Sequence, residues 1–260
     1  MKLDDATLDA IVAGVLARLA AEAPVAAPAT PAPSAPCGGE AGHACTATPR
    51  PVHAVESPVY EAMLPRLVAL TSSQVAVGRA GNRFRTDLYL QAREGHADAR
   101  DAVHSEVDPA WATRHGLTPL QTRCRDRHEH LLYPNHGRRL ADASRGLVER
   151  RAGSRPDVVL VVGDGLSANA VTVNGSDTLE ALRAALAAAG LRTGAESYFV
   201  KFARIGVADE IGVITGARAS VMLVGERPGL GAGDSLSLYL TVAPKLDQDN
   251  SEKNCISNVR

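Results

Sequence analysis

Three short apolar segments that alternate with helical segments constrain the fold of this chain more than any other feature. Residues 157–162 (DVVLVV) read as a strand buried on both faces, and residues 197–203 (SYFVKFA) and 219–224 (ASVMLV) read as a second and a third strand. Between them the sequence predicts a helix that ends at Gly190 and a short helix at 208–217. Strands that alternate with helices favour an α/β fold with a mainly parallel sheet and right-handed crossovers.

Ligands of such sheets bind beyond the carboxyl ends of the parallel strands. The loops 163–174, 204–207 and 225–234 are expected to meet there, and the third is rich in glycine. That loop is not a P-loop, because no lysine follows Gly231, and its glycine spacing differs from the dinucleotide fingerprint. Residues 236–242 alternate as in a strand, so no helix N-terminus follows to hold phosphate. We expect this sheet edge to receive a ligand without carrying chemistry.

The sequence offers no catalytic or metal site. GLSAN around Ser167 lacks the last glycine of a nucleophile elbow, and no nucleophile–His–Asp set or paired acids are evident. His128 and His130 have a spacing that suits neither helical metal pairs nor HExxH, and we interpret both as surface residues. Four cysteines fit no disulfide framework or zinc spacing, as expected in a reducing cytosol: Cys37, Cys45, Cys124 and Cys255.

The N-terminal part is predicted to be separate from the sheet. Residues 1–20 form an amphipathic helix, because the apolar residues from Leu8 to Leu19 recur at helical spacing. Residues 21–57 form an Ala/Pro-rich linker, expected to be flexible and disordered. The helix packs on its own chain or docks on another protein surface. Residues 58–150 are expected to be mainly helical, and residues 151–260 to carry the sheet.

Overall charge excludes two classes of partner. The formal net charge is −1 and aromatic residues make up 3%, so we expect no nucleic-acid binding and no general attraction to membranes. No apolar run is long enough to span a bilayer.

Two arginine-rich stretches could hold phosphate or carboxylate, although a solvated surface or an ion-pair network explains them more simply. Their arginines are Arg79, Arg83 and Arg85, then Arg138 and Arg139.

Several motifs resemble the small (light) subunit of ethanolamine ammonia-lyase. The resemblance covers roughly residues 60–260, and its motifs are GRAGNRFRT (78–86), LYPNHGRRL (132–140), VVGDGLSANAVTVN (161–174), VGERPGLG (224–231), SLSLYLTVAP (235–244) and NCISNVR (254–260). It implies an adenosylcobalamin-dependent enzyme that converts ethanolamine to acetaldehyde and ammonia by a radical route. A large TIM-barrel subunit would carry the catalytic residues, and a Rossmann-like small subunit would cover the cobalamin between the two. Large subunits would form a ring from which small subunits project.

The resemblance implies three cofactor contacts. Glu226 of GERPGLG would accept hydrogen bonds from corrin amides, and Cys255 of NCISN would be the second contact. Ile205 stands where relatives have valine and would be a backbone or packing contact. Two alternatives remain open: Glu226 pairs with Arg227, or Cys255 is an ordinary buried thiol.

Further expectations concern the cofactor, the chain ends and the cell. Residues 126–131 (DRHEHL) lack the glycine of D-x-H-x-x-G, which favours a base-on cofactor. Family members continue beyond the position of Arg260, so we expect this chain to be truncated relative to them. Residues 1–20 resemble in style the segments that target relatives to shell proteins of the ethanolamine-utilisation microcompartment, with the cytoplasm as the other location. The rival hypothesis is a stand-alone Rossmann-like module that binds a nucleotide or another small ligand.

Overall fold

A computed structural model describes residues 55, 58–60, 62–70, 75–153, 155–230 and 233–259. The predicted helix at 1–20 and linker at 21–57, apart from Val55, lie outside these residues. None of the described helices has the length and apolar character needed to span a bilayer. In chain order the elements are α2 (Met63–Ala69), β1 (Arg79–Ala80), β2 (Arg83–Phe84), α3 (Thr86–His104), α4 (Pro109–Arg114), β3 (Thr118–Gln121), α5 (Arg127–Leu132), η1 (His136–Arg138), α6 (Asp142–Arg151), β4 (Val158–Gly163), α7 (Ala168–Ala188), β5 (Tyr198–Lys201), α8 (Gly206–Thr215), β6 (Ala219–Gly225), β7 (Leu236–Val242), η2 (Asn250–Glu252) and β8 (Asn254–Val259).

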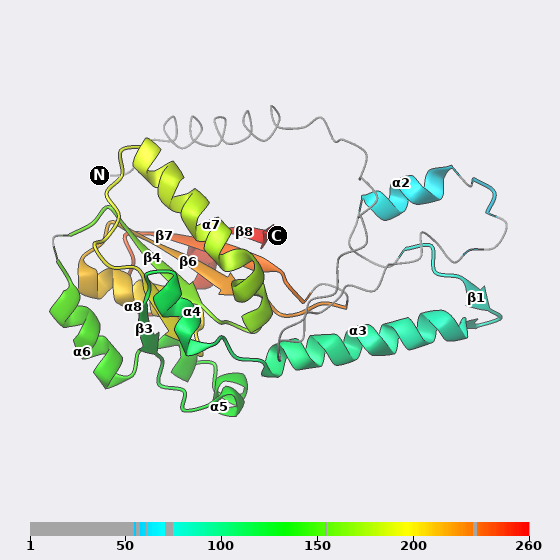
Figure 1. Ribbon diagram of the computed structural model, residues 1–260, viewed down its shortest axis with the longest axis horizontal. Coiled ribbons are helices and arrows are strands. Elements are labelled where there is room, and N and C mark those ends of the chain that lie inside the picture. The colour runs from blue at the N-terminus through cyan, green and yellow to red at the C-terminus, as the bar shows by residue number, and fades with distance from the viewer. Residues whose placement is uncertain are drawn as a thin grey trace. The chain divides into compact units, whose positions relative to one another are not determined.

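A six-stranded sheet in the order β3-β5-β4-β6-β7-β8 organises the chain (Figure 1). β3, β5, β4 and β6 run parallel to their neighbours, whereas β7 and β8 continue the sheet antiparallel. The three predicted strands correspond to β4, β5 and β6. The predicted α/β class with a mainly parallel sheet is therefore confirmed.

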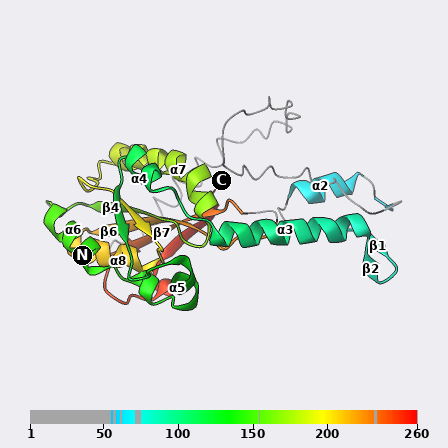
Figure 2. The same ribbon diagram turned by 60° about the horizontal axis from the view of Figure 1, so that its bottom comes forward.

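Helices cover both faces of the sheet, as the alternation within β4 shows. Val158, Leu160 and Val162 belong to one apolar cluster together with residues of α4 and α7. Val159 and Val161 belong to the other cluster, which residues of α6 and α8 complete. Figure 2 shows the two pairs of helices on opposite sides of the strands. All six residues of β4 are buried, which explains why this segment is apolar without interruption.

The predicted loop at 163–174 is wrong in its second half, because α7 already begins at Ala168. Ser167 caps this helix, since its side chain accepts a hydrogen bond from the backbone N–H of Ala170. Ala170 and Val171 are fully buried against the sheet. Burial of this first turn therefore favours helix in a stretch whose β-branched residues have weak helix propensity.

The part expected to be mainly helical, 58–150, also contributes β3 to the sheet, a strand that was not predicted. β3 is four residues long and pairs only with β5, as the first strand of the sheet order. β8, at the opposite edge, was also not predicted. The domain boundary predicted at residue 150 stays a prediction.

The interpretation of both histidines of DRHEHL as surface residues is wrong for His130. His128 is exposed, but the His130 side chain is completely buried. His130 lies on the inner side of the short helix α5, with its ring centroid 6.2 Å from that of Phe202. Residues two positions apart point in different directions on a helix. The spacing alone therefore did not show which of the two histidines is buried.

Candidate functional site

A cavity lies at the carboxyl ends of β4, β5 and β6. β4 leads into α7 on one face of the sheet and β5 leads into α8 on the other, so the two connections diverge at neighbouring strands. Such a divergence is where α/β sheets bind ligands. The cavity measures about 240 Å³. Its walls are Gly165 and Leu166 after β4, Ala203, Arg204 and Ile205 after β5, Val224, Gly225 and Glu226 at the end of β6, and Pro134, Arg138 and Asn250.

The loop after β4 is held tightly against the end of β6. The backbone N–H of Leu166 donates to the carbonyl oxygen of Gly225 at 2.9 Å. Gly165 has a φ of +56°, and a Cβ at that position would lie 2.2 Å from the same carbonyl oxygen. Only glycine fits this combination of left-handed backbone and close approach. The floor of the cavity is therefore largely backbone.

Ile205 and Glu226 both line this cavity. Ile205 is the N-cap residue of α8 and is partly buried. Glu226 follows β6 directly, and one of its carboxylate oxygens accepts a hydrogen bond from the Tyr239 hydroxyl at 2.9 Å. The carboxylate thus bonds to Tyr239, no ion pair joins it to Arg227 among the described residues, and its role stays a prediction.

Cys255 adjoins the cavity through Tyr239. It lies directly opposite Tyr239 in the β7–β8 register, and its thiol is free and exposed, so the alternative of an ordinary buried thiol is wrong. Burial raises the pKa of Tyr239, and hydrogen bonding to Glu226 and Cys255 raises it further. Tyr239 therefore stays a neutral donor at physiological pH and connects the two predicted contacts, Glu226 and Cys255.

Two cationic side chains, Arg138 and Arg204, also line the cavity. Arg204 donates from Nη2 to the carbonyl oxygen of His130 at 2.9 Å, while its buried Nε has no hydrogen-bond partner. Arg138 donates weakly to the carbonyl oxygen of Gln248 at 3.4 Å. Its neighbour Arg139 instead forms an ion pair with Asp247 at 2.6 Å. The cavity thus offers one carboxylate acceptor and guanidinium donors beside Asn250 and several apolar side chains.

Comparison with known families gives this geometry a context. Residues 61–260 match the model of the ethanolamine ammonia-lyase light chain family (EutC). The chain belongs to this family. It is therefore part of a lyase, and a light chain implies a hetero-oligomer with the large subunit. Ethanolamine ammonia-lyase is a cobalamin-dependent enzyme family.

In this light chain, neither nucleophilic chemistry by Ser167 nor metal binding is supported by the described residues. Ser167 caps α7 and donates its hydroxyl proton to the carbonyl oxygen of Gly233 at 2.6 Å, so it is no free nucleophile. Within the described residues, no cluster of His, Cys, Asp or Glu could hold a metal ion.

Tyr239 and Asn250 were missed as site residues of the light chain. Tyr239 belongs to a strand that was predicted, but its role depends on the pairing of β7 with β8. Asn250 lines the cavity from a 3₁₀ turn whose cap, Asp249, was not recognised in the sequence. Arg138 carried a signal, since it belongs to one of the arginine-rich stretches, but no partner for it could be predicted from the sequence.

Proposed function

We propose that this light chain is a non-catalytic subunit that covers adenosylcobalamin at the interface with the large subunit. The observation that carries the proposal is the cavity at the sheet edge, which joins Ile205 and Glu226 and adjoins the exposed Cys255. Three residues from distant segments converge on one side of the sheet. The family motifs and the general rule for ligand sites in α/β sheets both indicate a site at this edge of the sheet.

The residues present suit the surface of a corrin. Its periphery carries methyl groups and amide side chains, which need apolar contacts, hydrogen-bond acceptors and donors. Leu166, Ile205 and Val224 offer apolar contacts, and the second oxygen of Glu226 is available to accept from an amide N–H. Arg138 and Arg204 supply donors for amide carbonyls.

The size of the cavity supports an interface position. Sites that enclose a whole drug-sized ligand have volumes of roughly 300–1,000 Å³. At about 240 Å³ the cavity can hold only part of a ligand as large as cobalamin. The light chain would supply one wall, and the large subunit would cover the rest.

In this proposal the chain's own residues orient and shield the cofactor. When bound, adenosylcobalamin supplies the radical chemistry that converts ethanolamine to acetaldehyde and ammonia. The apolar wall would exclude water from one side of the corrin, and Glu226, oriented by Tyr239, would fix its rotation through the amides. The catalytic residues would lie on the large subunit.

The proposal includes the wider assembly. The sheet with helices on both faces would be the Rossmann-like domain expected of such a subunit, projecting from a ring of large subunits. Residues 1–20 would dock on shell proteins of an ethanolamine-utilisation microcompartment. If they do not, the complex would act free in the cytoplasm.

Glu226→Ala tests the cofactor contact. In the complex with the large subunit, we expect the substitution to weaken cobalamin binding about tenfold, because it removes a charged hydrogen-bond acceptor. Equilibrium dialysis with adenosylcobalamin measures the affinity. Glu180→Ala, which removes an exposed carboxylate on α7, is the matched control. Equal affinities for both variants and the unsubstituted complex would refute the assignment.

A further inference from the structure

A buried ion pair lies behind the cavity wall and does not itself line the cavity. Arg127, the first residue of α5, and Asp164, which follows β4, have side chains that are 7% and 1% exposed, with 3.4 Å between Nη2 and Oδ2. Burying two charges costs free energy that their attraction often fails to offset. Stability is therefore a weak explanation for this pair, and its contacts indicate another role.

Arg127 holds the loop after β4. It donates from Nη1 to the carbonyl oxygen of Gly165 at 2.7 Å, and Gly165 lines the cavity. From Nη2 it donates to the carbonyl oxygen of Ser105, at the end of α3, at 2.6 Å. The guanidinium also lies over the ring of Phe202, 5.7 Å from its centroid.

Asp164 holds the loop after β5. Its Oδ1 accepts a hydrogen bond from the backbone N–H of Ala203 at 3.0 Å, and Ala203 is a cavity residue next to Arg204 and Ile205. The loop after β4 is bonded in turn to the end of β6 through Leu166 and Gly225. One ion pair thus connects, directly or through one backbone bond, the three loops that carry the cavity.

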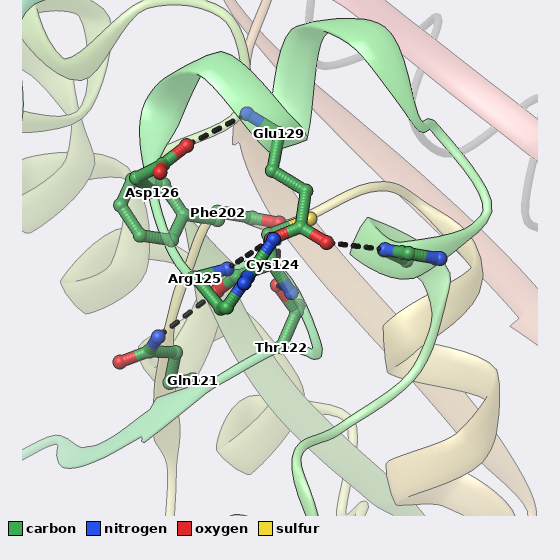
Figure 3. A network of polar contacts seen from close by, with 8 residues as sticks. Gln121, Thr122, Cys124, Arg125, Asp126, Glu129 and Phe202 are labelled. Carbon is green, nitrogen blue, oxygen red and sulfur yellow. Dashed lines mark hydrogen bonds and ion pairs between the residues drawn. The ribbon is translucent and has the colours of Figure 1, made fainter.

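The start of α5 is itself fixed, which gives Arg127 a defined position. Asp126 caps α5 by accepting from the backbone N–H of Glu129 at 2.8 Å, and Glu129 accepts from the backbone N–H and Nε of Arg125 at 2.9 and 3.0 Å (Figure 3). Thr122 donates its hydroxyl proton to the carbonyl oxygen of Phe202 at 2.9 Å. These bonds anchor the segment before α5 to the loop after β5.

We propose that Arg127 and Asp164 are positioning residues that hold the three cavity loops in the arrangement that binds the cofactor. This inference rests on the proposed function for the identity of the ligand. Neither side chain contacts the ligand; both act through the backbone of Gly165 and Ala203. When buried hydrogen bonds already hold the loops of a binding site in place, the ligand does not have to order them. Binding is therefore stronger.

The test replaces both charges together, so that neither is left buried alone. Arg127→Met/Asp164→Ala removes the pair. The control, Arg192→Met/Asp157→Ala, removes a more exposed Arg–Asp pair (3.3 Å) directly before β4, at the other end of the strand. Three properties are measured in the complex with the large subunit, and one of them is the KM for ethanolamine at saturating adenosylcobalamin. Amide hydrogen exchange without cobalamin reports on residues 163–167 and 202–205. Absorbance titration with adenosylcobalamin gives the affinity.

We expect faster exchange in both loops and an affinity lowered about tenfold for the Arg127/Asp164 variant, as is typical when residues supporting a binding site are lost. The KM for ethanolamine at saturating cobalamin should not change, and the Arg192/Asp157 variant should match the unsubstituted complex in all three. Arg127→Lys keeps the positive charge but loses the forked donor. Its loop exchange rates and cobalamin affinity should therefore lie between those of the unsubstituted complex and those of the Arg127/Asp164 variant.

Each other result is decisive. Unchanged loop exchange in the Arg127/Asp164 variant would overturn the positioning role. Faster exchange with unchanged affinity would also overturn it, provided that Glu226→Ala lowers the affinity; the proposed cofactor site would then stand. If Glu226→Ala leaves the affinity unchanged while the Arg127/Asp164 variant lowers it, the pair positions a cobalamin site that Glu226 does not contact. If neither lowers it, both proposals are wrong.

Discussion

At the scale of single residues, His130 is a buried base that packs near the site. Both ring nitrogens are buried without a hydrogen-bond partner. Burial lowers the pKa of His130 to about 4, and the positive charges of Arg204 and Arg127 add to the effect. His130 is therefore neutral at physiological pH, and it packs behind the loop that carries Arg204.

This perturbation predicts a pH-dependent stability. Because the folded pKa of about 4 lies below the ordinary value of 6.5, the unfolded chain binds more protons between these values. Stability is thus retained above pH 6.5 and falls as the pH drops towards 4, with a loss of about 3 kcal/mol from this residue. His130→Leu should remove that part of the pH dependence in urea unfolding, whereas His128→Leu, at an exposed position, should not. Identical pH profiles for the His130 variant and the parent chain would contradict this account.

The residues of the candidate site differ in how far the sequence reveals them. Glu226 and Ile205 follow predicted strands, so the rule for parallel sheets already places them at one edge. Tyr239 could not be placed in this way, since alternation indicates which face a side chain occupies but not which residue of β8 lies opposite. Arg127 was missed because a buried arginine is uncommon and its partners are 22 to 38 positions away.

At the scale of elements, β8 depends on one buried ion pair. This edge strand pairs only with β7, and five of its six residues are exposed. Lys253, directly before it, has a completely buried side chain that donates to Asp209 of α8 and to the hydroxyl of Thr241 in β7. The pair fixes the start of the strand that carries Cys255.

Breaking this pair should therefore destabilise the chain. Lys253→Met leaves Asp209 buried without its partner and should lower the free energy of unfolding by about 3–5 kcal/mol. Lys253→Met/Asp209→Leu removes both charges and should recover most of that loss. Urea unfolding of the two variants measures the difference. A double variant no more stable than the single one would show that the unpaired carboxylate is not the cause.

The elements found from the sequence share a strong local signal. β4 is a continuous apolar run, β5 and β6 are mostly apolar, and leucine or valine occupies every second position of β7. β3 lacks such a run, because an edge strand of four residues that includes Pro119 is specified by its pairing with β5. The early start of α7 depends on burial against the sheet, which a local pattern does not contain.

At the scale of the whole molecule, the described chain exposes apolar side chains that a partner would cover. Phe84, Tyr89 and Leu90, at the end of β2 and the start of α3, are 54%, 51% and 60% exposed. Ile256, beside Cys255, is 63% exposed. Aromatic residues with neighbouring arginines are typical of protein interfaces, which agrees with a light chain that acts in a hetero-oligomer.

The most direct test of the central claim is the assay of acetaldehyde formation from ethanolamine. A matching large subunit with adenosylcobalamin is assayed with and without this chain, and the complex is isolated to measure the cobalamin it retains. Turnover and stable cofactor retention should require both chains, and Glu226→Ala should lower the retention. Equal turnover and equal retention by the large subunit alone would contradict it.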